Sequence, residues 1–208
     1  MNNNTPHLVV ISAPSGTGKT TVVKALLASR NNLVASISYT TRPKRANESD
    51  SEDYNVVSSV AFESMITNGD FLEYAKVFGN YYGTPKKEVD EQLSSGKNVI
   101  LEIDWQGAMQ IKQKVTDCLS LFLLPPSKNE LMKRLQKRGT DTNEEIKIRF
   151  SEALNDIKQF EHFDRVFVNQ NIDATVNQIL AYIENPCLSK TKLSEDLLSI
   201  IKGFQQGL

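Results

Sequence analysis

Residues 13–20 read Ala-Pro-Ser-Gly-Thr-Gly-Lys-Thr, and this stretch decides the fold. Apart from its first position, where Ala13 replaces glycine, it matches the pattern G-x-x-x-x-G-K-[ST] of loops that wrap nucleotide phosphates. Residues 8–11 before it are apolar and rich in β-branched side chains, and residues 20–29 after it have apolar side chains at helical spacing. Strand, loop and helix therefore follow in the order that a phosphate-binding loop requires.

A helix start binds phosphate because its first backbone N–H groups are unpaired and carry partial positive charge. Gly16 and Gly18 let the backbone come close to the ligand. We expect Lys19 to reach the β- and γ-phosphates and the Thr20 hydroxyl to bind the Mg²⁺ that accompanies them. A chance glycine turn would not explain the strand and helix on either side. The loop predicts phosphate chemistry but leaves the acceptor open.

The composition is that of one globular domain. The 208 residues are 39% apolar and 24% charged, with a net charge of -1, which suits a single sizeable core and argues against a general nucleic-acid or membrane-surface binder. Cys118 and Cys187 lack the spacing of metal ligands and are expected to be inert thiols in a reducing compartment. We find no export signal and no membrane-spanning apolar run, so we expect a cytoplasmic protein. The oligomeric state, monomer or homo-oligomer, stays open.

Short apolar runs alternate with amphipathic stretches along the chain, which predicts an α/β fold with a mostly parallel sheet flanked by helices. The expected strands are residues 8–11, 34–38, 71–77, 98–104, 119–124 and 165–168. The expected helices are residues 20–29, 59–68, 86–95, two after Pro125-Pro126, and 172–183, with Thr84-Pro85 capping the third. Residues 39–53 are polar and predict a long loop. The tail is expected to carry a surface helix without a catalytic role.

Two capping boxes mark the helices that follow Pro125-Pro126. Ser127 with Glu130, and Thr142 with Glu145, have the spacing at which a hydroxyl and a carboxylate satisfy the first backbone N–H groups of a helix. The sequence therefore predicts two helices joined near residues 138–140.

A basic and hydroxyl-rich cluster follows the second expected strand: Ser38, Thr40, Thr41, Arg42 and Arg45, with Tyr54 beyond. Arg42 and Arg45 could grip one phosphate, because guanidinium donors match phosphate oxygens, and Tyr54 could add a hydroxyl donor. Acidic residues in the same segment make a solvated charged loop the simpler interpretation of this stretch taken alone.

Glu73 lies in an apolar frame, Phe71-Leu72-Glu73-Tyr74, a short distance before Tyr82 and Thr84. A carboxylate in such a frame needs a partner. Guanine offers one, since its N1–H and N2–H groups form a donor edge that adenine lacks. An outward-facing position on an edge strand would explain Glu73 equally well.

Three arginines, Arg134, Arg138 and Arg149, occupy the two helices after the proline pair. Arg134 and Arg138 share a helix face, and Arg149 could return toward them, so this helical hairpin could fold over a phosphate chain. Arginines on solvated helix surfaces are the alternative. Separately, the strand ending at Asp104 could place a carboxylate near magnesium.

Taken together, these residues resemble the guanylate kinase family over about residues 7–184. The resemblance rests on an ordered series of motifs: APSGTGKT (13–20), SYTTR (38–42) with Arg45, Glu48 and Tyr54, FLEYAKVFGNYYGT (71–84), IDWQGA (103–108), LPPS (124–127), and RLQKRG (134–139) with Arg149 downstream. It implies a P-loop nucleoside monophosphate kinase fold that transfers the γ-phosphoryl group of ATP to GMP, with magnesium as cofactor. It further implies a core of about residues 7–37, 96–125 and 155–184, a GMP-binding lobe of 38–95, a lid of 126–150 and a tail of 185–208.

The resemblance also implies the site residues. The GMP site would comprise Ser38, Arg42, Arg45, Tyr54, Glu73, Tyr82, Thr84 and Asp104, with Glu73 and Asp104 toward guanine. The ATP site would comprise Ala13, Pro14, Ser15, Gly16, Thr17, Gly18, Lys19 and Thr20, with Arg134 and Asn169 near adenine. Transfer would depend on Lys19, Arg45, Arg138 and Arg149. Magnesium would meet Thr20, with Glu102 or Asp104 as further candidates.

The chain departs from the family pattern in three places. The acceptor loop has Pro43 and Asn47 at unusual positions, Glu102 replaces an aspartate, and Gln170 replaces the aspartate after Asn169. Two rival functions are a guanylate-kinase-like module that binds a phosphopeptide and a kinase of another acceptor, such as a ribose phosphate. The intact Gly18-Lys19-Thr20 speaks against the module, and Glu73 speaks against the sugar phosphate.

Overall fold

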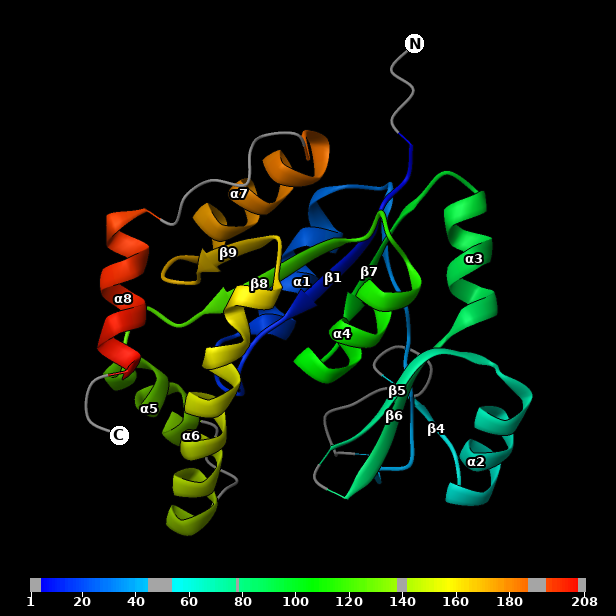
Figure 1. Cartoon of the computed structure of the whole chain (residues 1–208), viewed down its shortest axis with the longest axis horizontal. Helices are drawn as coiled ribbons and strands as arrows, with labels where there is room; N and C mark the ends of the chain where they lie inside the picture. The colour runs from blue at the N-terminus through cyan, green and yellow to red at the C-terminus, as the bar shows by residue number, and fades with distance from the viewer. Residues whose placement is uncertain (1–4, 45–53, 78, 138–141, 187–193, 206–208) are drawn as a thin grey trace.

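The computed structural model describes residues 5–44, 54–77, 79–137, 142–186 and 194–205. Within these ranges a central parallel sheet has the strand order β2-β7-β1-β8-β9 (Figure 1). Its strands are β1 (Leu8–Ser12), β2 (Leu33–Ala35), β7 (Asn98–Glu102), β8 (Leu119–Leu124) and β9 (Arg165–Val168). Every residue of β1 and β8 is buried, as expected for parallel strands that are covered on both faces.

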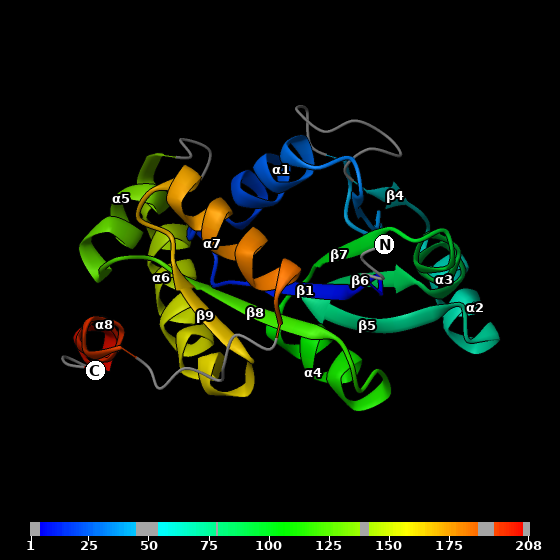
Figure 2. The same ribbon diagram turned by 90° about the horizontal axis from the view of Figure 1, so that it is seen from above.

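Helices cover both faces of this sheet (Figure 2). On one face, α1 (Lys19–Ser29) and α7 (Ile172–Glu184) pack against the strands through side chains such as Leu26 and Ile179. The opposite face carries α3 (Lys86–Ser94), α4 (Trp105–Lys114), α5 (Lys128–Lys137) and α6 (Asn143–Ile157), followed by the 3-10 helix η1 (Lys158–His162). This arrangement confirms the predicted mostly parallel sheet flanked by helices.

A second sheet, with the order β4-β3-β6-β5, lies beside the first. Its strands are β3 (Tyr39–Thr40), β4 (Asn55–Val56), β5 (Phe71–Val77) and β6 (Asn80–Pro85), and α2 (Ser59–Asn68) packs on it. The rings of Phe71 and Tyr81 stack on Phe62 at 4.5 and 5.2 Å between centroids. A Cβ atom on Gly83 would come within 2.9 Å of Phe62 and Phe71, so this position has no room for a side chain.

Several sequence predictions were wrong at this second sheet. Tyr39–Thr40 is a strand and not the start of a loop, because it pairs with β6 and β4. Residues 80–85 form a strand that pairs with β5, and Thr84 is part of it. Pro85 is the N-cap residue of α3 and no side chain caps that helix, so Thr84 does not have the predicted capping role.

The central region also differs from the prediction. β2 covers residues 33–35 instead of 34–38, and the strand predicted to end at residue 104 ends at Glu102. Asp104 instead begins the unpredicted helix α4, with its side chain accepting a hydrogen bond from the Gly107 N–H at 2.8 Å. The strand prediction failed here because an N-cap aspartate and a strand-ending aspartate look alike in sequence.

The two helices predicted after Pro125-Pro126, α5 and α6, and the predicted helix near the C-terminus all form, with different details. Thr142 and Glu145 make a complete capping box for α6. The Ser127 hydroxyl accepts a hydrogen bond from the Glu130 N–H, whereas the Glu130 carboxylate pairs with Arg134 Nε at 2.9 Å. The tail helix α8 (Glu195–Gln205) is not merely superficial, because Ile201 and Phe204 are buried in the core beside α5 and α6.

Two remaining predictions concern the cysteines and membrane-spanning segments. Cys118 is buried and unpaired, and burial, the largest influence, together with the charge of Asp164 raises the pKa of its thiol. Cys187 lies outside the described residues. No helix in the described ranges combines the length and the apolar composition needed to cross a membrane.

Candidate active site

A cavity of about 340 Å³ lies between the phosphate loop and the four-stranded sheet. Residues from distant parts of the chain line it: the loop before α1, the end of β7, strands of the second sheet, and α6. Most of the site residues predicted from the sequence therefore meet in one place.

The phosphate loop lines one wall of the cavity through Ala13, Pro14, Ser15, Gly16, Gly18, Lys19 and Thr20. Gly16 and Gly18 have φ angles of 84° and 94°, in the left-handed region that favours glycine. A Cβ atom on Gly16 would also lie 2.8 Å from the Leu135 side chain. The loop bends in this way into the N-terminus of α1, where free backbone N–H groups are suited to bind an anion.

Lys19 and Thr20 reach across to β7, the strand beside β1. The Lys19 ammonium donates a hydrogen bond to the Ile103 carbonyl oxygen at 2.8 Å, and the Thr20 hydroxyl donates one to Glu102 Oε1 at 2.5 Å. A hydroxyl and a carboxylate oxygen are the hard ligands that Mg²⁺ prefers, and this ion commonly takes only one or two carboxylates beside phosphate oxygens and waters. Thr20 and Glu102 therefore fit magnesium. Asp104, the other candidate, also lines the cavity.

Within the described part of the chain, no group of three or more His, Cys, Asp or Glu side chains is arranged to hold a metal ion. Such a cage is not needed for an ion that enters with the phosphates of its substrate.

Arg134 and Asn169 do not line the cavity but hold its loop from behind. Arg134 Nη1 donates to the carbonyl oxygens of Thr17 and Asn169 at 3.0 and 3.1 Å, and Asn169 Nδ2 donates to the Thr17 carbonyl oxygen at 2.8 Å. Asn169 is only 3% exposed. Both residues thus fix the backbone of the phosphate loop, a contact that the sequence did not indicate.

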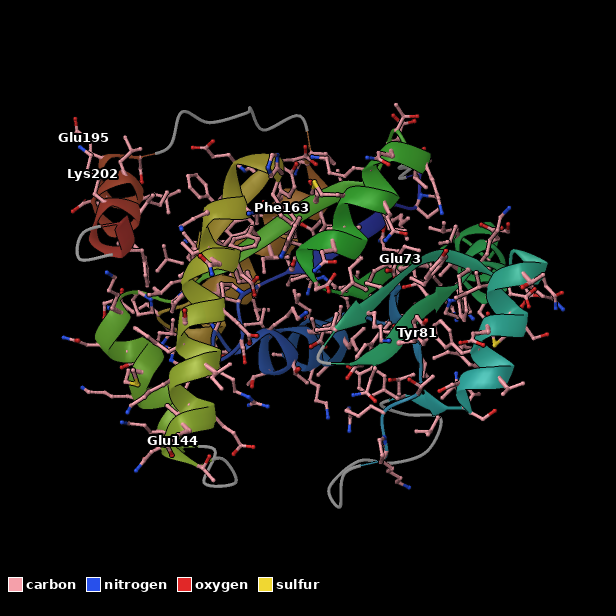
Figure 3. All side chains as sticks on the ribbon, turned by 60° about the horizontal axis from the view of Figure 1, so that its bottom comes forward. Glu73, Tyr81, Glu144, Phe163, Glu195 and Lys202 are labelled. Atoms are coloured by element: carbon pink, nitrogen blue, oxygen red, sulfur yellow. The ribbon has the colours of Figure 1, made fainter. Side chains whose placement is uncertain are left out.

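Glu73 lies at the opposite end of the cavity, where β5 meets α4 (Figure 3). Its side chain is 3% exposed, and its Oε1 accepts a hydrogen bond from the Thr84 hydroxyl at 2.5 Å. Burial, helped by the charge of Asp104, raises the pKa of Glu73 to about 7, although the Thr84 hydrogen bonds and Lys114 act in the other direction. β5 is an edge strand of its sheet, but Glu73 does not face outward, so an outward-facing position does not explain this carboxylate.

Asp104 has a structural duty at this end of the cavity as the N-cap of α4. Thr84 does not line the cavity and acts on it through Glu73. The family resemblance predicted both residues beside Glu73: Thr84 donates a hydrogen bond to it, and Asp104 begins the helix that faces it.

The remaining predicted acceptor residues form a polar and aromatic wall. Ser38, Arg42, Tyr54 and Tyr82 all line the cavity. The Arg42 guanidinium lies over the Tyr54 ring at 5.4 Å from its centroid, and Tyr54 meets Tyr82 edge to face at 5.9 Å. Such stacking restrains both the cation and the phenol. Arg45 lies outside the described residues.

Helix α6 supplies the last wall through Arg149, Glu152 and Asp156. Only Arg149 was predicted, although the spacing of these three residues puts them on one helix face and could have revealed the other two. Asp156 Oδ1 accepts a hydrogen bond from Trp105 Nε1 at 3.1 Å. Burial, with added repulsion from Asp104 and Glu152, raises the pKa of Asp156 to about 6. Arg138 lies outside the described residues.

Comparisons with known proteins agree with this geometry. The family model for guanylate kinase matches residues 5–186. A guanylate kinase of Hydrogenovibrio crunogenus is 47% identical over 83% of this chain and 84% of its own length, and one of Clostridium perfringens is 44% identical over 94% and 91%. The crystal structure of guanylate kinase from Anaplasma phagocytophilum superposes with a TM-score of 0.73 at 31% identity, covering 90% of this chain and 89% of that one.

Proposed function

Because the chain belongs to the guanylate kinase family, we propose that its cavity binds ATP on the phosphate-loop side and GMP on the side of the four-stranded sheet. Members of this family are ATP:GMP phosphotransferases, and this protein is such an enzyme, converting GMP to GDP. The assignment of ATP to one side and GMP to the other rests on one observation: the phosphate loop and the buried Glu73 carboxylate line the same cavity.

Glu73 is assigned the recognition of guanine. Its carboxylate accepts the N1–H and N2–H groups of the base, while Thr84 holds its other oxygen. Charge-assisted hydrogen bonds of this kind are strong in a site that excludes water. Adenine lacks this donor edge and would leave the buried carboxylate with only its Thr84 hydrogen bond, and an under-satisfied buried acceptor costs free energy.

The GMP phosphate is assigned to the wall of Ser38, Arg42, Tyr54 and Tyr82, with Arg45 completing it. This assignment is supported by the stack of Arg42 on Tyr54 beside the cavity. A guanidinium and phenolic hydroxyls match the geometry of phosphate oxygens.

Phosphoryl transfer needs no general base, because the acceptor is a phosphate oxygen that is already anionic at neutral pH. The barrier instead comes from repulsion between two polyanions, which Lys19, Arg45, Arg138 and Arg149 would reduce while they stabilise the charge of the transferring group. Lys19 would leave the Ile103 carbonyl oxygen to meet the β- and γ-phosphates. Magnesium, held by Thr20 and Glu102, would neutralise phosphate charge when bound.

These roles would divide the chain into four parts. Residues 7–37, 96–125 and 155–184 would form the core that carries ATP, and residues 38–95 the GMP-binding lobe. Residues 126–150 would form the lid, and residues 185–208 a tail outside the reaction. Closure of lobe and lid would align donor and acceptor and exclude water, which would otherwise hydrolyse ATP.

The test is ADP formation from Mg-ATP with GMP, dGMP, AMP, CMP, UMP or ribose 5-phosphate offered separately. We expect turnover with GMP and little with AMP, CMP, UMP or the sugar phosphate; dGMP decides whether the 2′-hydroxyl matters. Turnover with ribose 5-phosphate would overturn the guanine role of Glu73. GMP binding without any turnover would favour a phosphopeptide-type binding module instead.

A further inference from the structure

Gly107, in the first turn of α4, faces the Glu73 carboxylate at the guanine end of the cavity. A Cβ atom on Gly107 would lie 2.5 Å from Glu73 Oε2, 3.0 Å from its Cδ and 3.3 Å from Ile103 Cδ1. Gly107 is not among the glycines with positive φ, so its backbone conformation suits any residue. The requirement for glycine here is therefore one of space, set by the carboxylate.

The Glu73 carboxylate cannot easily move away from a side chain at position 107. Its Oε1 is bound by the Thr84 hydroxyl, and the backbones of Glu73 and Thr84 are register partners in the pairing of β5 with β6. The side chain is also almost completely buried. A displaced carboxylate would break the Thr84 contact and lose its alignment with the cavity.

Helix α4 cannot easily move away either, because its side chains are hydrogen-bonded to the backbone of β5 on both sides of Glu73. The Lys114 ammonium donates to the Leu72 carbonyl oxygen at 2.6 Å. The Gln110 side chain bonds both the N–H and the carbonyl oxygen of Tyr74, at 3.3 and 2.7 Å. The Gly107 N–H is itself held by Asp104. These contacts fix the distance between helix and strand, so the carboxylate is the part that must move.

We propose that Gly107 determines the specificity for the acceptor base. Because it has no side chain, it leaves room for the Glu73 carboxylate in the position from which that group can accept both guanine N–H groups. This rests on the proposed guanine role of Glu73. A methyl group at position 107 would push the carboxylate toward the cavity and out of line with the 2-amino group, so that the contact made only with guanine is the one weakened. Gly107 is thus a positioning residue, which acts on the base through Glu73.

Inosine monophosphate separates this effect from general damage, because it keeps the N1–H of guanine but lacks the 2-amino group. We would measure kcat and KM for GMP, IMP and ATP in the wild type, in Gly107→Ala and in Gly203→Ala. Gly203 is also a helical glycine, and a Cβ atom on it would meet nothing within 4 Å, so it serves as the matched control.

Gly107→Ala is expected to lower kcat/KM for GMP by about 10²-fold, the cost of misplacing a contact group by roughly an ångström. Most of the loss should appear in KM for GMP, and the preference for GMP over IMP should fall with it. KM for ATP should stay within about twofold of the wild type, since the phosphate loop is at the other end of the cavity. Gly203→Ala should behave as the wild type.

A double-mutant cycle tests whether Gly107→Ala acts on GMP recognition through Glu73. In a Glu73→Gln background, Gly107→Ala should add little to the loss of GMP preference, because the two changes act through one side chain. Full additivity would overturn the proposal, as would an unchanged GMP/IMP preference in Gly107→Ala. A wild type that does not phosphorylate GMP would instead contradict the proposed function and is recognised before any variant is compared.

Folding is monitored by the thermal midpoint of each variant. If Gly107→Ala does not fold, the same change is made together with Glu73→Ala, which removes the carboxylate. Recovery of folding in that double variant supports the close packing of Gly107 on Glu73, and failure to recover overturns it.

Discussion

If Glu73 binds guanine as proposed, the protonation of its buried side chain should control the affinity for GMP. Because its pKa is raised to about 7, the side chain is largely neutral below that pH and largely a carboxylate above it. Only the carboxylate can accept both guanine N–H groups. KM for GMP should therefore decrease as pH rises through about 7, by about tenfold per pH unit on the acidic side, and then level off. The measurement is KM for GMP between about pH 5.5 and 8.5, a range that brackets the raised pKa.

Glu73→Gln is the control for this pH dependence. The variant has no titrating group at the position, so its KM for GMP should be higher and should lack the inflection near pH 7. The GMP phosphate, with a second pKa of about 6, titrates in both proteins, and the difference between the two profiles isolates Glu73. Parallel profiles would assign the inflection to another group.

Lys19 is the residue whose loss should affect chemistry more than binding. Lys19→Ala removes a cation that would stabilise the transferring phosphoryl group, so kcat should fall by about 10²–10³-fold. GMP binding, measured by calorimetry, should change little, because Lys19 belongs to the phosphate loop and is assigned to the ATP phosphates. Lys87→Ala, an exposed lysine on α3, is the control. A Lys19→Ala variant with wild-type kcat would remove Lys19 from the mechanism.

Individual residues differ in how far the sequence could place them. The phosphate loop was predictable because all its requirements are local: glycines, a lysine and a hydroxyl between a strand and a helix. Glu73 could be singled out as a carboxylate in an apolar frame a short distance before Thr84, but its contact with Gly107 joins segments far apart in the chain. The helical spacing from Arg149 could have pointed to Asp156, but its hydrogen bond with Trp105 of another helix could not be predicted from the sequence.

Among the elements, the end of β9 acts as a support for the phosphate loop. Asn169→Ala removes one donor to the Thr17 carbonyl oxygen and leaves a buried acceptor less well satisfied. We expect KM for ATP to rise by about tenfold with KM for GMP nearly unchanged, and stability to fall by about 1–3 kcal/mol.

Asn171→Ala provides the matched control for this support. Asn171 caps α7 through a hydrogen bond from the Ala174 N–H, so its loss should lower stability by about 1 kcal/mol. It does not touch the loop, and KM for ATP should stay at the wild-type value. Equal KM values for ATP in both variants would show that Asn169 matters only for stability.

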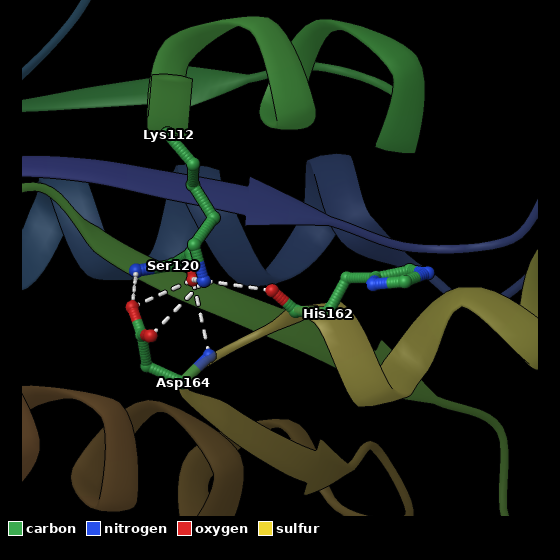
Figure 4. Close-up of polar contacts among 4 residues, drawn as sticks. All are labelled: Lys112, Ser120, His162 and Asp164. Atoms are coloured by element: carbon green, nitrogen blue, oxygen red, sulfur yellow. Dashed lines mark hydrogen bonds and ion pairs between the residues drawn. The ribbon is translucent and has the colours of Figure 1, made fainter. Parts of the chain in front are cut away.

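A second group of contacts joins α4 to the start of β9 (Figure 4). Lys112 donates to Ser120 Oγ, the His162 carbonyl oxygen and Asp164 Oδ1, and Asp164 also accepts from the N–H and hydroxyl of Ser120. Burial alone would raise the pKa of Asp164, but the hydrogen bonds from Ser120 and Lys112 outweigh it and lower that pKa. The ionised form of Asp164 therefore stabilises the fold.

Asp164→Asn should lower the free energy of unfolding by about 1.5 kcal/mol, the lower end for hydrogen bonds to charged groups, since the side chain is 32% exposed. The contribution of the carboxylate is present above its unfolded-state pKa and is lost as pH falls through the lower folded-state value. Urea unfolding at pH 7 and pH 3 measures both. The stability difference between wild type and variant should shrink at pH 3; a constant difference would contradict an ionic contribution.

Elements with a strong periodic pattern were predictable, and those defined by pairing were not. Residues 71–77, 119–124 and 165–168 have the predicted strand bounds, and α2 has the predicted helix bounds. β6 contains glycine and proline and becomes a strand because β5 and β3 pair with it. α4 starts with Trp105, Gln106 and a glycine, and its apolar side chains Ala108 and Ile111 are recognised as core only after the sheet is in place.

In the molecule as a whole, the cavity is enclosed by parts that are distant in sequence, namely the phosphate loop, the second sheet and α6. Transfer requires the phosphates of two nucleotides to meet, so these parts should approach one another when both substrates bind. Trp105, the single tryptophan of the sequence, reports on this motion. It lies on α4 and donates its hydrogen bond to Asp156 of α6, the helix that also carries Arg149.

If Arg149 turns toward the phosphates, α6 should shift and the environment of the Trp105 indole should change. We expect a change in tryptophan emission when GMP and a non-hydrolysable ATP analogue are added together, larger than the sum of the changes with each alone. Trp105→Phe should abolish the signal. Arg149→Ala should reduce it at saturating nucleotide, because the helix loses its contact with the phosphates while the nucleotides still occupy the cavity. An equally large change in Arg149→Ala would mean that the nucleotides alter the indole directly, and an unchanged spectrum in the wild type would mean that α6 keeps its place beside α4 throughout the reaction.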